Sequence, residues 1–92
     1  MVTAIVLLKV ERERLGRVAE TLRDITGVSE VCYVAGQWDL VAILRARDDD
    51  HFASIVTEGM LQVEGIKSSE TLIAIQVLSR YDLGSVFASE LG

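Results

Sequence analysis

Two stretches decide the fold: residues 18–28, which read "VAETLRDITGV", and residues 56–66, which read "VTEGMLQVEGI". The second repeats the apolar positions and the glycine of the first at a constant distance of 38 residues. The matched positions are Val18 and Val56, Leu22 and Met60, Ile25 and Val63, Gly27 and Gly65, and Val28 and Ile66. Apolar residues at helical spacing followed by glycine are typical of the end of a helix. We therefore expect two copies of one unit, in which a helix ends at a glycine and leads into a strand.

Segments with the composition of strands flank both helices. Four segments are apolar and β-rich and are predicted as strands: residues 2–10, 28–36, 38–46 and 66–79. The first helix is predicted over residues 11–26, and Gly36 and Gln37 form a short bend between the second and third strands. The stretch "RDDDH" at residues 47–51 supplies acids for the start of the second helix, where they complement the helix dipole. The apolar stripe of that helix consists of Phe52, Val56, Met60 and Val63.

The order strand–helix–strand thus occurs twice, which gives βαββαβ. Within each half the two strands must run parallel, with the helix as a right-handed crossover. This is the ferredoxin-like α+β fold of the dimeric α+β barrel type, a four-stranded antiparallel sheet with two helices on one face. We expect a single domain over residues 1–80. Residues 81–92 form a C-terminal tail, in which a short helix is expected from the spacing of Leu83, Val86, Phe87 and Leu91.

The sheet face that points away from the helices is too apolar to meet water. A sheet with one face in water alternates apolar and polar residues, but the first, third and last strands place apolar residues on both faces. On the first strand, Ile5 and Leu7 point away from the face that carries Val6. Because an exposed patch of this size marks an interface, we predict at least a dimer, formed by stacking the sheets of two copies.

Composition and charge argue against several classes of function. The chain has 92 residues and a net charge of −5, from 9 Lys and Arg against 14 Asp and Glu. Nucleic-acid binding needs clustered cations, whereas Arg12, Arg14, Arg17 and Arg23 lie among acids, as on a solvated helix face. The apolar segments are far shorter than the roughly 20 residues of a membrane span, and no secretory signal is found. We expect a cytoplasmic protein without membrane or direct nucleic-acid contacts.

Few residues suggest catalysis or metal binding. His51, the only histidine, lies beside Asp48, Asp49 and Asp50, where it is either a metal or proton-transfer residue or part of a solvated helix start. The three aspartates lack the glycine and distal glutamate of a calcium loop. Cys32, the only cysteine, rules out an internal disulfide and is expected to be a small buried hydrophobic residue. We therefore predict no catalytic residue, no metal and no cofactor.

The bend "GQWD" at residues 36–39 belongs to a longer pattern. A Gly-x-aromatic-Asp bend precedes an apolar strand in "GQWDLVAIL", an acid-led helix follows in "DDDHFASIVTEGML", and "GIKSSETLIAI" enters the last strand. In this order within a βαββαβ chain, these motifs resemble the ligand-binding domain, or RAM domain, of the Lrp/AsnC transcription regulators. The resemblance covers residues 2–79, nearly the whole of the expected domain. Trp38 is a departure, because the family more often has a tyrosine or a smaller aromatic residue there.

The resemblance implies an assembly and a ligand. Family members stack their sheets into dimers, and the dimers close into rings, commonly octamers, which bind amino acids or similar small effectors at the contacts between dimers. The ligand-binding candidates carried over by position are Gly36, Trp38, Asp39, Ser69 and Thr71. Asp39 could accept hydrogen bonds from an ammonium group, while hydroxyls and backbone N–H groups hold a carboxylate. The plainer alternatives are that Asp39 caps the bend, Trp38 packs between subunits and Thr71 is an ordinary strand residue.

Three functions remain open. Full-length regulators carry an N-terminal helix-turn-helix domain that is not seen here, so the chain resembles a stand-alone, amino-acid-responsive module that acts alone or joins a full-length regulator's ring. One alternative is a small dimeric α+β barrel enzyme of the monooxygenase or isomerase type, although the positions where such enzymes carry polar groups are aliphatic here. The other alternative is a purely structural assembly subunit. We expect the ligand-binding module rather than an enzyme.

Overall fold

The computed structural model describes residues 1–78 and residue 80, so the helix expected within residues 81–92 lies outside the described residues. The elements in chain order are β1 (Val2–Val10), η1 (Arg12–Arg14), α1 (Leu15–Arg23), β2 (Val28–Tyr33), β3 (Leu40–Ala46), α2 (Asp49–Ser54), η2 (Ile55–Gly59), η3 (Met60–Gln62) and β4 (Ile66–Ile73). Here η1 and η3 are 3-10 turns, and η2 is a π-helical turn that continues α2.

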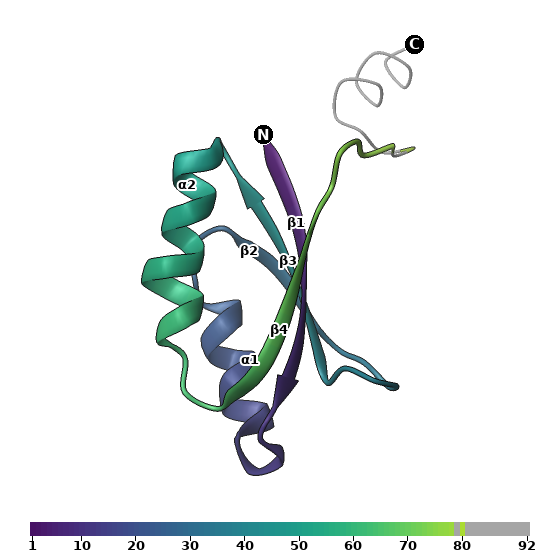
Figure 1. Cartoon of the computed structure of the whole chain (residues 1–92), viewed down its shortest axis with the longest axis vertical. Coiled ribbons are helices and arrows are strands. Elements are labelled where there is room, and N and C mark those ends of the chain that lie inside the picture. Colours follow the sequence, from purple (N-terminus) through teal and green to yellow (C-terminus); the bar gives the residue numbers. More distant parts are fainter. Residues whose placement is uncertain (79, 81–92) are drawn as a thin grey trace.

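The four strands form one sheet in the order β2-β3-β1-β4, and all neighbours are antiparallel. Because β1 and β2 are both antiparallel to β3, they run in the same direction, as a right-handed crossover through α1 requires. Both helical segments lie on one side of the sheet (Figure 1). The predicted ferredoxin-like βαββαβ fold is therefore confirmed.

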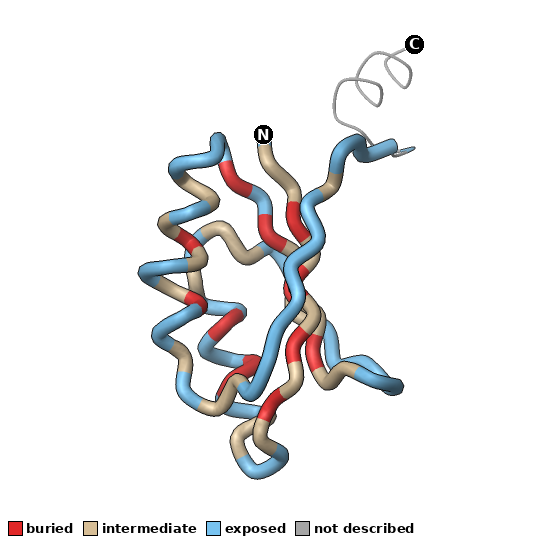
Figure 2. Tube along the Cα trace, viewed as in Figure 1, coloured by how far each residue is buried: buried red, intermediate tan, exposed pale blue. Residues whose placement is uncertain are grey.

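The core lies between the helices and the two central strands. Alternate residues of β1 and β3 are buried there, whereas the residues between them are mostly half-buried. The buried sheet residues are Ala4, Val6, Leu8, Val10, Leu40, Ala42, Leu44 and Ala46, and the helical segments cover them with Val18, Ala19, Leu22, Ile55 and Met60 (Figure 2). No polar or charged residue is buried in the part of the chain that the structure describes.

The opposite sheet face carries two apolar rows that run across the strands. The register places Ile5 beside Ile43 on β3 and beside Leu72 on β4, and it places Leu7 beside Val41. Leu72 has 44% of its surface exposed, and the other four are half-buried. The sequence prediction that both faces are apolar is therefore confirmed for β1 and β3. The last strand departs from it, because Ser69 and Thr71 lie on the helix side of β4 and Glu70 lies beside Leu7 on the open side. The prediction of a stacked dimer rests on β1 and β3.

The last strand is shorter than predicted. β4 ends at Ile73, although its apolar pattern continues to Leu78. The sheet neighbour of β4 is β1, which begins at Val2, and the last backbone hydrogen bond between them runs from Ala74 N to Thr3 O at 2.9 Å. Beyond that point the chain has no strand beside it, so Ile75 is fully exposed. The side-chain pattern indicates a tendency to form a strand, but the neighbouring strand, which supplies the backbone hydrogen bonds, determines how long the strand is.

The second helix differs from the prediction in its winding. The sequence pattern predicts one α-helix with Val56 on its buried face, but the helix widens to a π turn from Ile55 to Gly59. Ile55 and Met60 are the buried residues of this segment, and Val56 is half-buried. In a π turn a backbone N–H bonds to the carbonyl five residues earlier instead of four, and the Met60 N–H donates to Ile55 O in this way. Residues 55 and 60 therefore lie above one another and share the core-facing side. The predicted stripe therefore omitted Ile55.

The matched glycines of the two halves adopt the same backbone conformation. Gly27 has φ of 101° and Gly65 has φ of 105°, in the left-handed region where side chains are strained. A Cβ at Gly27 would also collide with the Ile55 side chain, because that isoleucine packs directly on the glycine. The repeat seen in the sequence thus marks two equivalent helix-to-strand turns.

We expect Gly27→Ala to destabilise the protein by at least about 2 kcal/mol. Alanine is strained at the positive φ of this position, and its Cβ would collide with the Ile55 side chain. Gly16→Ala is a matched control, because Gly16 lies in α1 and an added Cβ would meet no atom within 4 Å. That control should stabilise the protein by about 0.5–1 kcal/mol. Urea unfolding at one fixed protein concentration measures both, and equal effects of the two substitutions would contradict this account of the turn.

Candidate functional site

The bend between β2 and β3 is fastened to the sheet by Asp39. Its backbone N–H donates to Leu8 O at 2.8 Å, its carboxylate Oδ2 accepts from Val10 N at 2.9 Å, and its carbonyl accepts from Val34 N at 3.1 Å. Two of these bonds reach β1, which is far away in sequence. Asp39 therefore caps the bend, and the connection that it holds projects from the side of the sheet opposite the helices (Figure 1).

Trp38 and Gly36 occupy the exposed part of the same bend. The Lys9 ammonium lies 5.7 Å from the centre of the Trp38 ring, at the distance of a cation–π contact. Lys9 belongs to β1, and Trp38 is half-buried. Gly36 has φ of 127°, and a Cβ added there would meet no atom within 4 Å. The tip of the bend is thus open to a ligand or a neighbouring chain.

The hydroxyl residues of β4 lie in a different place. Ser69 and Thr71 are opposite Leu8 and Val6 in the register, so they share the helix-covered face. Both are exposed, and they line a small cavity of about 150 Å³ between β4 and the second helical segment, together with apolar residues such as Met60. In one chain, Ser69 and Thr71 therefore do not share a cavity with Asp39.

A second recess is bordered by Asp39 of the bend and by residues at the end of β1, the start of α1 and the start of β4. It has a volume of about 400 Å³ and is lined by Val10, Arg12, Leu15, Asp39 and Lys67. Sequence reasoning missed Arg12 and Lys67, because the neighbours of Arg12 in the chain are acids and Lys67 stands alone. The topology offers the signal that local sequence lacks: β1 and β4 are antiparallel neighbours, so the end of β1 adjoins the start of β4.

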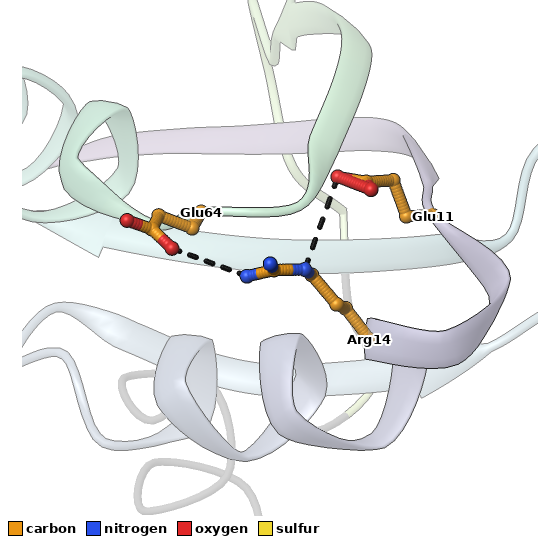
Figure 3. A network of polar contacts seen from close by, with 3 residues as sticks. All are labelled: Glu11, Arg14 and Glu64. Carbon is orange, nitrogen blue, oxygen red and sulfur yellow. Dashed lines mark hydrogen bonds and ion pairs between the residues drawn. The ribbon is translucent and has the colours of Figure 1, made fainter.

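An ion-pair network joins the two chain segments that carry Arg12 and Lys67. Arg14 lies between two acids, 3.1 Å from Glu64 and 4.0 Å from Glu11 (Figure 3). The Glu11 N–H also donates to Gly65 O at 2.8 Å. These contacts join η1, which carries Arg12, to the turn before β4, which carries Lys67. Exposed ion pairs contribute little to stability, so the backbone bond is the firmer of these connections.

The remaining reactive side chains have structural roles or no partners. His51 donates its backbone N–H to Asp48 Oδ1 at 2.8 Å and accepts a bond at Nδ1 from Arg47 N at 2.9 Å, which is the capping pattern of a helix start. Cys32 is exposed on the open sheet face, beside Val41, so the expectation of a buried cysteine is wrong for the single chain.

Residues 1–78 and 80 contain no group of His, Cys, Asp and Glu suited to a metal. None of their helices is long and apolar enough to cross a membrane.

Known proteins share both the sequence pattern and the fold. The family described as Lrp/AsnC ligand binding domain matches residues 3–83. An uncharacterised HTH-type transcriptional regulator of Pyrococcus furiosus is 35% identical over 57 residues, which are 62% of this chain and 38% of that regulator. The chain thus matches well under half the length of the curated relatives.

Solved structures share the fold. A protein of Thermus thermophilus is 36% identical, with a TM-score of 0.80 over 87% of this chain and 100% of that chain. A transcriptional regulator of Neisseria meningitidis, solved as a complex with L-methionine, shares the fold at 14% identity, with a TM-score of 0.74 over 85% of this chain and 52% of that chain. The matched family covers every strand and helix described above, the bend at residues 36–39 included. The chain therefore belongs to the Lrp/AsnC family and forms its ligand-binding domain.

Proposed function

We propose that this chain is an amino-acid-responsive oligomeric module that binds a small effector at contacts between dimers. The observation that carries the proposal is the bend at residues 36–39, which Asp39 fastens to β1 while Gly36 stays open. A loop that is already held in place loses little conformational entropy when a ligand binds. Membership of a family of transcription regulators supports effector binding, and the L-methionine complex of the Neisseria regulator supports an amino acid as the effector.

The dimer in this proposal is formed by stacking the open sheet faces of two copies. The side chains of the rows Leu72–Ile5–Ile43 and Leu7–Val41 would then be buried between the two copies. Each Å² of apolar surface removed from water contributes about 25 cal/mol. A two-fold stack uses the same patch on both copies, as isologous dimers do.

Neighbouring dimers would complete the effector site. Asp39 and the hydroxyls of Ser69 and Thr71 line separate recesses of one chain. An effector that contacts both Asp39 and these hydroxyls must therefore lie between two chains, with Asp39 from one chain and the hydroxyls from the other. A ring of dimers, octameric as the family resemblance implies, supplies such contacts, either among copies of this chain or with full-length Lrp/AsnC regulators.

The geometry favours this reading over an enzyme of the α+β barrel type. Such an enzyme would place polar groups in the cavity between helices and sheet. In this chain that cavity is lined by aliphatic side chains and methionine, and its polar lining consists of the Ser69 and Thr71 hydroxyls. The curated relatives are named as transcriptional regulators, which agrees with the regulatory reading.

A thermal-shift screen against the twenty standard L-amino acids at millimolar concentration tests the proposal. A ligand present at 100 times its dissociation constant, and bound only by the folded state, adds about 2.7 kcal/mol to stability. In a domain of this size each kcal/mol raises Tm by about 4–8 °C. We expect a shift of this order with a small subset of amino acids. The absence of a shift with all twenty would overturn the proposed function and leave the family assignment in place.

A further inference from the structure

The cavity beside β4 is an apolar groove that reaches the surface of the chain. It has a volume of about 150 Å³ and lies between β4 and the segment that contains η2 and η3. Met60 is buried in its wall, whereas Leu61, which also lines it, is largely exposed. Most of the remaining lining is aliphatic and consists of Val6, Leu8, Val56, Val63 and Ile66. An apolar concave surface of this kind is suited to bind an apolar group.

The C-terminal tail carries an apolar side chain of matching size. Residues 81–92 are the tail defined from the sequence, and the apolar residues spaced there for one helical face are Leu83, Val86, Phe87 and Leu91. An apolar cavity of about 150 Å³ accepts a molecule as large as benzene. A phenylalanine side chain ends in a ring of that size, so Phe87 is the tail residue that fits the groove.

The chain after β4 leads toward the place where a second copy is proposed to stack. β4 ends at Ile73, and the described residues that follow it lead away from α2, on the side of the sheet opposite the helices (Figure 1). The groove lies on the helix side, because Val6 and Thr71, which line it, are paired in the register and Val6 is buried under the helices. The tail therefore begins on the side of the sheet that is remote from the groove of its own chain.

The tail is long enough to reach the groove of the stacked copy. Stacked sheets lie about 10 Å apart, and residues 81–92 in a helix are about 18 Å long. The tail can therefore pass the edge of the second sheet and reach its helix side. The chain that leads to the tail is also apolar, with Ile75 fully exposed and Leu78 exposed. Contact with a second copy would cover these side chains.

We propose that the tail of one copy docks in the groove of the stacked second copy, with its Phe87 ring beside Met60 and Thr71 of that groove. The inference rests on the stacked dimer of the proposed function. The groove also contains the hydroxyls of Ser69 and Thr71, which the proposed function assigns to the effector. The docked tail and an effector at these hydroxyls exclude each other, so effector binding releases the tail.

Disulfide trapping between cysteine variants of the full chain tests the docking. Cys32, the only cysteine, is first replaced by serine in every chain. Two chains are then co-expressed, one with Thr71→Cys and the other with Phe87→Cys, and one of them carries a tag so that a mixed dimer is recognised by its mass. The control pairs Phe87→Cys with Arg17→Cys, at an exposed position of α1 that does not line the groove.

After mild oxidation, we expect a covalent mixed dimer from the Thr71 and Phe87 pair and at least about tenfold less from the control. Equal yields from the two pairs, in proteins that remain dimers, would overturn the inference and leave the proposed function standing. A disulfide that forms only within one chain, when both substitutions are placed in it, would overturn the assignment to a second copy. If the full chain is monomeric at every concentration, the inference fails together with the proposed stacked dimer.

The release of the tail by an effector is tested by isothermal titration with the twenty standard L-amino acids. Phe87→Ala should bind those that bind the wild-type protein about tenfold or more tightly, because the tail no longer competes for the groove. Ser85→Ala is the control within the tail and should bind them as the wild-type protein does. Unchanged affinity in Phe87→Ala would overturn the release of the tail. Binding of none of the twenty would overturn the proposed function and the release with it, whereas the disulfide yields still decide the docking.

Discussion

Replacing Ile43 by lysine should prevent the proposed stacking of two sheets and leave the protein monomeric. Ile43 lies on the central strand β3 and belongs to the apolar row with Ile5 and Leu72 on the open sheet face. In a two-fold stack the substitution occurs twice, and each copy loses about 1.5–3 kcal/mol of apolar burial. An unpaired charge in the interface adds a further cost. The dimer dissociation constant should rise by about a thousandfold or more, which sedimentation equilibrium across a range of protein concentrations measures.

The fold of the single chain should tolerate this change. Glu30 is the cross-strand neighbour of residue 43 on β2, and opposite charges at such positions are weakly favourable. Leu61→Lys is the matched control, because Leu61 is 69% exposed on the second helical segment, away from the open face. The control should remain dimeric. A dimer of unchanged affinity in Ile43→Lys would show that the open face is not the interface.

Local periodicity was sufficient to predict most of the fold. The apolar run predicted a first strand over residues 2–10, and β1 has these bounds. The matched glycines at 27 and 65 predicted two helix ends, and both adopt the same positive φ. Two features depend on tertiary contacts and could not be predicted in this way. β4 ends where β1 no longer lies beside it, and η2 widens so that Ile55 packs on Gly27.

The site was predictable where it depends on a local bend and not where it depends on topology. The Gly-x-aromatic-Asp pattern directed attention to Asp39, whose bonds to Leu8 and Val10 hold the bend. Its assignment as a ligand-binding residue stays a prediction, as do those of the other four candidates. The sequence alone places Arg12 on a solvated helix face, since it does not reveal that the antiparallel β1–β4 pair brings Lys67 close to Arg12.

Two substitutions of Asp39 should separate its two roles. As a capping group it accepts from Val10 N, and as a ligand-binding group it would supply a negative charge to an ammonium. Asp39→Asn keeps an acceptor oxygen for Val10 N but removes the charge. Asp39→Ala removes both, and it leaves a half-buried backbone N–H without its partner, at a cost of about 1–3 kcal/mol. The amino-acid response should therefore be lost in both variants, whereas stability should fall in Asp39→Ala alone.

We expect Asp39→Asn to unfold at nearly the wild-type urea concentration and to give no thermal shift with the amino acids that stabilise the wild-type protein. Asp39→Ala should lose the same response and also unfold earlier, by about 1–3 kcal/mol. Both variants should remain dimers, because Asp39 bonds to β1 of its own chain and the apolar rows are untouched. A full amino-acid response in Asp39→Asn would mean that Asp39 only caps the bend, whereas wild-type stability in Asp39→Ala would mean that the Val10 bond is dispensable.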